Sequence, residues 1–240
     1  MSSLIIEKNS AHVWLIKKES IIKHIKYFNK LLSEDEKLKV SKFKFKKDKT
    51  TSIIARGSLR VLLSKYLNYP ATDFSFSYGV YGKPLLLDNQ SIKFNISHSG
   101  EIIVIAFCNL YDIGVDIEYV EKGFNVLDIV NNYFSNAEIQ ALHNLPESEH
   151  IEAFYRGWTR KEAFIKAKAK GLSFPLASFS VSIDSDKTTD LYETIWDKKE
   201  KELWDIIPFK TATHYKAALA VQAKINSIKY FELNSENILM

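Results

Sequence analysis

The sequence predicts an α+β protein built from two halves of similar size. Its 240 residues are 46% hydrophobic, enough to form a core without disulfides or a structural metal. Leu59, Leu62, Leu63 and Tyr66 follow the i, i+3, i+4, i+7 spacing of an amphipathic helix. Short alternating or wholly apolar runs recur along the chain, as expected for antiparallel strands. No Pro-, Gly- or Ser-rich linker separates the two halves in the sequence. We expect the halves to comprise residues 1–111 and 112–240.

The first half contains a helical region between short strands. Residues 20–32 have helical spacing, and Ser33 followed by Glu36 is a capping box that should start another helix. Pro70 should end the helix that contains Leu59. Predicted strands lie at residues 4–6, 13–16, 74–78, 92–96 and 102–107.

The second half combines the same kinds of element. A strand is predicted at 113–118, followed by helices at 126–134, 136–143 and 150–170, the last ending at Gly171. Further strands are predicted near 178–183, 191–196, 203–207 and 215–222.

Composition excludes several classes of protein. The single cysteine, Cys108, excludes an internal disulfide framework and a cysteine-based metal site within one chain. No apolar run reaches about 18 residues, and the N-terminus has no signal-peptide pattern, so we expect a cytoplasmic protein that does not enter membranes. The net charge of +4 is mild and does not by itself indicate nucleic-acid binding.

Two carboxylates share one face of the strand predicted at 113–118. Asp116 and Glu118 are two residues apart, so they point the same way while Val115 and Ile117 point into the core. Such a pair repels unless a cation offsets it, and hard oxygen ligands suit Mg²⁺ together with substrate phosphates. The alternative is a solvated pair of acids on an exposed strand.

A polar turn is expected after the strand at 92–96. Ser97, His98 and Ser99 precede Gly100, which permits tight backbone geometry. Imidazole, hydroxyl and backbone N–H groups together can hold a phosphate. The alternative is an ordinary hairpin turn with a structural histidine.

The helix at 150–170 places Trp158, Glu162 and Lys166 on one face, at i, i+4 and i+8. Glu162 has the chemistry of a general base, and Lys166 can hold a phosphate and stabilise leaving-group charge. The alternative is an exposed Glu–Lys pair on the helix surface. The large Trp158 on the same face argues against it, because tryptophan is usually mostly buried.

Two basic features are weaker signals. Lys83 lies between Gly82 and Pro84 in a predicted turn, which alone indicates only a turn. Seven lysines occur between residues 37 and 49 and form either a solvated helix face or a docking surface for phosphates or an acidic protein.

Taken together, these motifs resemble the longer, Sfp-type 4′-phosphopantetheinyl transferases. The resemblance covers residues 33–183, with Glu138 after Phe134 and Ser135, and Lys161 next to Glu162, as additional matching positions. It implies two similar α+β halves related by a pseudo-twofold axis, with coenzyme A bound between them. It also implies a monomer that transfers the phosphopantetheine arm to a serine of an apo carrier protein and releases 3′,5′-ADP. The carrier would be an acyl carrier protein of fatty-acid synthesis or a carrier domain of a polyketide or peptide synthetase.

The resemblance also implies roles for individual residues. Asp116 and Glu118, with Glu138 or a water as third ligand, would bind Mg²⁺. Glu162 would accept the serine proton, Asp116 would serve catalysis through the metal, and Lys166 would contact the pyrophosphate. Coenzyme A would be held by the following residues: Gly82, Lys83, Pro84, Ser97, His98, Lys161 and Lys166.

One position departs from the family pattern. An Arg usually follows the residue equivalent to Asp48 and binds the 3′-phosphate of coenzyme A, whereas Thr50, Thr51 and Ser52 occupy this stretch. The candidates to substitute for it are Lys47, Lys49 and Arg56, and Lys37 or Lys39 could also reach the phosphate. We expect weakened discrimination between coenzyme A and dephospho-coenzyme A. Two other functions remain open: a magnesium-dependent nucleotide hydrolase or nucleotidyl transferase, and a non-catalytic homologue that binds carrier proteins or coenzyme A.

Overall fold

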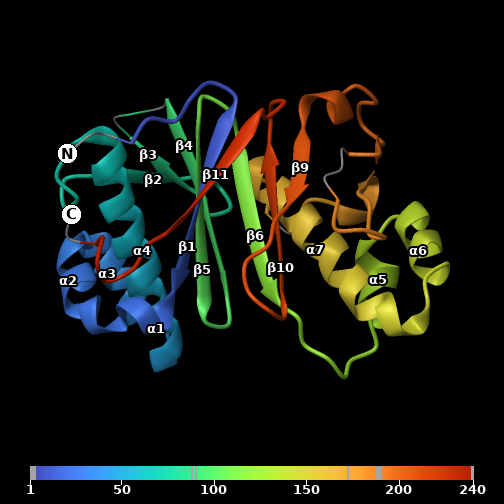
Figure 1. The fold of residues 1–240 in the computed structure, drawn as a ribbon, viewed down its shortest axis with the longest axis horizontal. Coiled ribbons are helices and arrows are strands. Elements are labelled where there is room, and N and C mark those ends of the chain that lie inside the picture. The colour runs from blue at the N-terminus through green and yellow to red at the C-terminus, as the bar shows by residue number, and fades with distance from the viewer. Residues whose placement is uncertain (1–3, 88, 90, 172, 188–190, 239–240) are drawn as a thin grey trace.

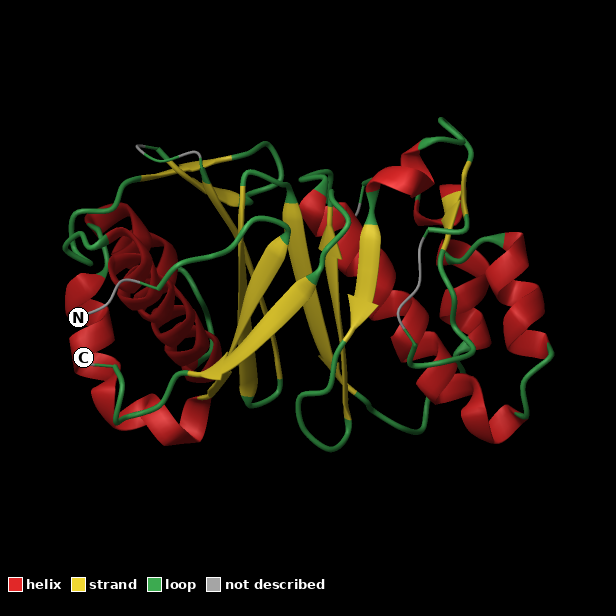
Figure 2. Ribbon diagram, turned by 45° about the horizontal axis from the view of Figure 1, so that its top comes forward, coloured by secondary structure: helices red, strands yellow, loops and turns green. Residues whose placement is uncertain are grey.

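Two β-sheets stacked face to face occupy the middle of the molecule, with helices on the two outer sides (Figures 1 and 2). The computed structural model describes all residues except 1–3, 88, 90, 172, 188–190 and 239–240. The arrangement confirms the predicted α+β class.

The first sheet has the strand order β11-β1-β5-β4. The hairpin of β4 (Ile92–Ser99) and β5 (Ile102–Asn109) continues antiparallel into β1 (Ser10–Lys17). Strand β11 (Ser227–Glu232) comes from the end of the chain and pairs with β1 in parallel. The predicted boundary between residues 111 and 112 remains a prediction; the chain after it returns to complete the first sheet.

Helices α2 (Ile25–Leu31) and α4 (Lys46–Leu67) lie on the outer side of this sheet, together with α1 (Lys18–Ile21) and α3 (Glu34–Ser41) (Figure 1). The short helix η1 (Ile22–His24) connects α1 to α2. Phe28 and Leu59 are fully buried between helices and sheet. The capping box of Ser33 and Glu36 is confirmed at the start of α3. The short strands β2 (Phe76–Tyr78) and β3 (Pro84–Leu86) form a separate hairpin.

The second sheet has the order β6-β10-β9, formed by Ile113–Tyr119, Tyr215–Val221 and Asp205–Pro208. Helix α7 (His150–Ala167) packs on its outer face. The remaining elements complete this side: α5 (Leu127–Tyr133), α6 (Asn136–His143), η2 (Glu147–Glu149), η3 (Leu176–Ser178), β7 (Phe179–Ser180), β8 (Glu193–Thr194) and η4 (Glu200–Leu203). No helix in the described part of the chain is long and apolar enough to span a membrane.

Several predicted elements differ from the structure. Residues 4–6 form no strand, and the strands expected at 178–183 and 191–196 are reduced to the two-residue β7 and β8. Strand β4 continues through Ser99, so the expected polar turn after residue 96 is wrong. The prediction missed β11 because its alternating sequence is mostly exposed and contains no apolar run.

Candidate active site

The contact between β6 and α7 creates the candidate site. Ile113, Val115 and Ile117 face the apolar layer between the two sheets, so Gly114, Asp116 and Glu118 face the other way, toward α7. A Cβ atom on Gly114 would collide with the carbonyl oxygen of Ala163 in α7. Glycine therefore permits the close approach that brings the carboxylates of β6 to the side chains of α7.

Asp116, Lys166 and Ser97 form a closed polar triangle. The Lys166 Nζ atom lies 2.5 Å from Asp116 Oδ1 and 3.0 Å from Ser97 Oγ, and Ser97 donates to the same Oδ1 at 2.8 Å. Burial lowers the pKa of Lys166, but the attraction of Asp116, Glu162 and Glu118 outweighs it, so the pKa is raised and the side chain remains a cation. This position supplies a fixed positive charge beside the carboxylates.

Glu162 joins this triangle from α7 as a further carboxylate. Its exposed fraction is 8%, which excludes the alternative of a solvated surface pair. Burial and the charge of Asp116 raise the pKa of Glu162 to about 7, with Lys166 opposing the shift. Burial and Asp116 likewise raise the pKa of Glu118 to about 7, although Ser99 donates to Glu118 Oε2 at 2.9 Å. Three acidic side chains are therefore electrostatically coupled around one lysine.

Strand β4 supports the site from the opposite side. Asn95 Oδ1 accepts a hydrogen bond from the Val115 N–H at 2.9 Å, and Ser99 Oγ accepts one from the Tyr119 N–H at 3.0 Å. Together with Ser97, these residues occupy alternate positions of β4 and attach it to β6. No role for Asn95 was predicted, although it lies in the predicted strand at 92–96, and Ser99 was expected in a turn. The spacing of two residues from Asn95 to Ser97 and Ser99 was the available signal.

His98 belongs to the other face of β4, so the structure does not bring it together with Ser97. It lines a pocket of about 560 Å³ with Lys18, Lys47 and Arg56. Packing around its ring, and then the charges of Lys166 and Lys18, lower the pKa of His98. The pocket and the carboxylate cluster thus lie on opposite sides of one strand and act on each other electrostatically.

The structure does not bring Glu138 and Lys161 to Asp116. Glu138 lies in the capping box of α6, where Oε2 accepts from the Ser135 N–H and Oε1 from the Val181 N–H. Its Oε2 also pairs with Lys161 Nζ at 2.8 Å, and both side chains are buried. Lys161 further donates to the carbonyl oxygens of Leu176 and Phe179. Both residues are held in contacts that support α6 and α7.

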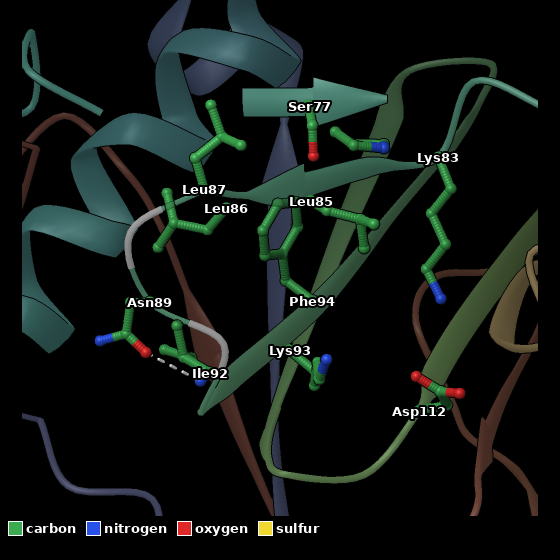
Figure 3. A pocket seen from close by; sticks show the side chains of 11 residues that line it. Ser77, Lys83, Leu85, Leu86, Leu87, Asn89, Ile92, Lys93, Phe94 and Asp112 are labelled. Atoms are coloured by element: carbon green, nitrogen blue, oxygen red, sulfur yellow. Dashed lines mark hydrogen bonds between the residues drawn. The ribbon is translucent and has the colours of Figure 1, made fainter. Parts of the chain in front are cut away.

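Lys83 lies beside the start of β6. Its Nζ donates to the Ile113 carbonyl at 2.9 Å and to the Ala167 carbonyl at 3.0 Å, and burial lowers its pKa to about 8. The side chain extends from the turn before β3 toward the side of a small pocket where Asp112 lies (Figure 3). Gly82 in this turn has a φ of 80°, while Pro84 begins β3 and borders both pockets.

The carboxylate cluster suits a hard cation. Asp116 Oδ2 and Glu162 Oε1 are buried without a hydrogen-bond partner, which is costly unless something satisfies them. Within the described residues, no group of three or more His, Cys, Asp and Glu side chains is spaced as a preformed metal centre. Mg²⁺ does not need one, since it usually takes one or two carboxylates with waters and substrate phosphates.

Comparison with known proteins identifies the family. The 4′-phosphopantetheinyl transferase superfamily matches residues 112–220, and the 4′-phosphopantetheinyl transferase N-terminal family matches residues 19–109. The 4′-phosphopantetheinyl transferase Sfp of Bacillus subtilis strain 168 is 35% identical over 159 residues, covering 66% of this chain and 70% of Sfp. The chain belongs to the 4′-phosphopantetheinyl transferase superfamily.

Other relatives of the transferase carry the same activity in their names. The 4′-phosphopantetheinyl transferase HetI of Nostoc sp. is 29% identical over 174 residues, covering 71% of this chain and 73% of HetI. The human L-aminoadipate-semialdehyde dehydrogenase-phosphopantetheinyl transferase is 26% identical over 207 residues, with coverages of 80% and 67%. The resemblance found in the sequence is therefore confirmed, and with it the transferase class.

Proposed function

We propose that this transferase moves the 4′-phosphopantetheine arm of coenzyme A to a serine of an apo carrier protein, in a Mg²⁺-dependent reaction that releases 3′,5′-ADP. One observation carries the proposal: Asp116, Glu118 and Glu162 are coupled around Lys166, and a pocket with several basic side chains lies on the other side of strand β4. A nucleotide with several phosphates requires this kind of positive surroundings, and an attacking hydroxyl requires a nearby base.

Glu162 is the proposed general base. Its carboxylate would take the proton of the carrier serine as the serine oxygen bonds to the phosphorus that carries the pantetheine arm. The bond from that phosphorus to the bridging oxygen breaks, and 3′,5′-ADP leaves with the bonding electrons. A pKa of about 7 suits a base at neutral pH, because it combines a large ionised fraction with proton affinity.

Lys166 is the proposed partner of the leaving phosphate. Its ammonium is already oriented by Asp116 and Ser97, so little reorganisation is needed when negative charge develops nearby. Asp116 would orient this ammonium through Oδ1, and its unpartnered Oδ2 would be available to a metal ion.

Asp116 and Glu118 would hold Mg²⁺, which when bound neutralises charge on the pyrophosphate. The unpartnered Asp116 Oδ2 and the raised pKa of Glu118 support this choice, because a cation would relieve both. Glu138 remains a weaker candidate, since both its oxygens already have partners.

We further propose that the transferase acts as a cytoplasmic monomer. The proposed catalytic residues all come from one chain, and the only cysteine, Cys108, is buried as a free thiol. Its carrier would be an acyl carrier protein or a carrier domain of a polyketide or peptide synthetase, as the family resemblance implies. Light scattering during gel filtration tests the oligomeric state.

Mass spectrometry of an apo carrier protein tests the reaction. The carrier is incubated with the transferase, coenzyme A and Mg²⁺, in parallel with an EDTA-treated sample. The proposal expects a phosphopantetheine mass increment that disappears with EDTA, and 3′,5′-ADP in equal amount. Free nucleotide without modified carrier would instead support a hydrolase. Binding of coenzyme A without either product would support a non-catalytic homologue.

A further inference from the structure

Lys18 lies in the pocket on the His98 side of β4. It is the first residue of α1, directly after β1, and its backbone N–H donates to the Glu101 carbonyl at 3.0 Å. Lys17 before it is paired with Ile102 in the sheet. The backbone of Lys18 is therefore fixed by regular hydrogen bonding at the edge of the pocket.

The Lys18 ammonium contacts α4 at the stretch where the family resemblance places an Arg and this sequence has none. Nζ donates to Thr51 Oγ1 at 3.3 Å, and the side chain is only 12% exposed. Thr51 belongs to the stretch after Asp48 where the family resemblance places an Arg. A lysine distant in sequence thus brings positive charge to this part of α4, which sequence spacing could not reveal.

The other cations of the pocket are less suited to this position. Arg56 pairs with Glu36 and donates to the Tyr78 hydroxyl at 3.1 Å, so its guanidinium is already used. Lys47 is exposed, and no hydrogen bond or ion pair to another described residue fixes its ammonium at the pocket. Lys18 is anchored and nearly buried. It therefore loses less conformational entropy on binding an anion than an exposed lysine would.

Two acids also face the pocket. Glu101 pairs with Lys18 at 3.2 Å, but its side chain is 73% exposed, so most of the carboxylate is in contact with water. Asp48 is partly exposed at the start of α4. The lining also contains three cations, Lys18, Lys47 and Arg56, so positive side chains outnumber negative ones in this pocket.

We propose that Lys18 is the specificity-determining residue of this pocket and binds the 3′-phosphate of coenzyme A. This inference rests on the proposed function and replaces the expectation, drawn from sequence, of weak discrimination against dephospho-coenzyme A. The ammonium of Lys18 provides the charge, and the Thr51 hydroxyl orients it.

The test compares kcat/KM for coenzyme A and for 3′-dephospho-coenzyme A with one apo carrier. The wild type should prefer coenzyme A. Lys18→Met should lower kcat/KM for coenzyme A by about 10- to 100-fold, the value of a charge-assisted hydrogen bond, and leave dephospho-coenzyme A unaffected. Lys17→Met is the matched control, because Lys17 pairs with Glu232 away from this pocket and should leave both values unchanged.

Two further variants separate charge from folding. Lys18→Arg should retain the preference for coenzyme A. Adding Thr51→Arg to Lys18→Met should restore it, since the new guanidinium would occupy the same region. The inference would be overturned if Lys18→Met lowered kcat/KM equally for coenzyme A and dephospho-coenzyme A. It would also be overturned if the wild type showed no preference for coenzyme A.

Calorimetric titration distinguishes failure of the inference from failure of the proposed function. The probes are 3′,5′-ADP and 5′-AMP, which differ by the 3′-phosphate. If no carrier is modified but the wild type binds 3′,5′-ADP more tightly than 5′-AMP and Lys18→Met does not, the function is wrong and the inference stands. Unchanged selectivity of Lys18→Met in this titration contradicts the inference directly.

Discussion

The ammonium of Lys166 lies 2.5 Å from Oδ1 of Asp116, whereas Oδ2 of the same carboxylate is buried without a partner. One oxygen thus orients the proposed leaving-group lysine and the other is left for a cation. Glu162 approaches the same carboxylate from one turn earlier in α7, and burial together with the repulsion of Asp116 raises its pKa to about 7.

Glu162→Gln should reduce kcat for carrier modification by about 10²- to 10⁴-fold, the usual contribution of a positioned general base. Its volume is retained, so KM for coenzyme A should change little. Glu152→Gln is the matched control, since Glu152 lies on the same helix but pairs with Lys216. Steady-state kinetics with both variants give the answer, and a Glu162→Gln enzyme as fast as wild type would remove Glu162 from the reaction.

The stability of the metal-free protein should fall as pH rises from about 4.5 to about 7. The pKa of Glu162 is raised from 4.5 to about 7 on folding, so the folded state holds this proton more tightly than the unfolded state. The resulting stabilisation is complete below pH 4.5 and is lost as pH rises through 7. Glu118 contributes in the same direction.

Glu162→Gln should therefore stabilise the metal-free protein at pH 8, by an amount on the order of 2 kcal/mol relative to its effect at pH 4.5. Urea unfolding in EDTA at several pH values measures this difference. Glu147→Gln, at an exposed position in η2, should show no such trend. A stability gain that does not depend on pH would contradict the assigned cause.

Glu138→Gln should destabilise the protein by about 3–5 kcal/mol, because it leaves the buried Lys161 ammonium without its ion pair. The Mg²⁺ concentration for half-maximal activity should remain unchanged, whereas Asp116→Asn should raise it. The double variant Glu138→Gln with Lys161→Met should recover part of the lost stability. An increased Mg²⁺ requirement at normal stability would instead support Glu138 as a metal ligand.

Lys83→Met should lower the free energy of unfolding by about 1–3 kcal/mol, since the Ile113 and Ala167 carbonyls lose a charged donor. We expect kcat to fall because these carbonyls lie at the ends of β6 and α7 that carry the site. Lys93→Met, from the same small pocket, is the control. A raised KM for coenzyme A with normal kcat and stability would favour direct contact between Lys83 and the nucleotide.

Gly114→Ala should lower the free energy of unfolding by about 3 kcal/mol or more. The added methyl group would collide with the backbone of α7, which cannot move aside as a flexible side chain can. Gly79→Ala is the matched control, as its Cβ would make only an ordinary contact with the Lys83 carbonyl. Thermal unfolding followed by circular dichroism compares the two. Equal melting temperatures would mean that the contact between β6 and α7 is looser than described.

Local patterns were sufficient for much of the fold. The capping boxes, the apolar run of β5 and the helical face of Glu162 and Lys166 depend on neighbours within a few residues, so the sequence alone contains their cause. The same locality made the motif of Asp116 and Glu118 and the family resemblance accessible without a structure.

The sequence by itself determined which chemical groups the transferase carries and on which kind of element each lies. Only the tertiary structure decided which groups meet. It brought Ser97 to Asp116 across 19 positions and Lys18 to Thr51 across 33, and it engaged Glu138 with Lys161 instead. The physical reason is that helix and strand propensity and hydrophobic periodicity depend on residues within one or two turns. Ion pairs and strand neighbours instead depend on how segments distant in the sequence pack together.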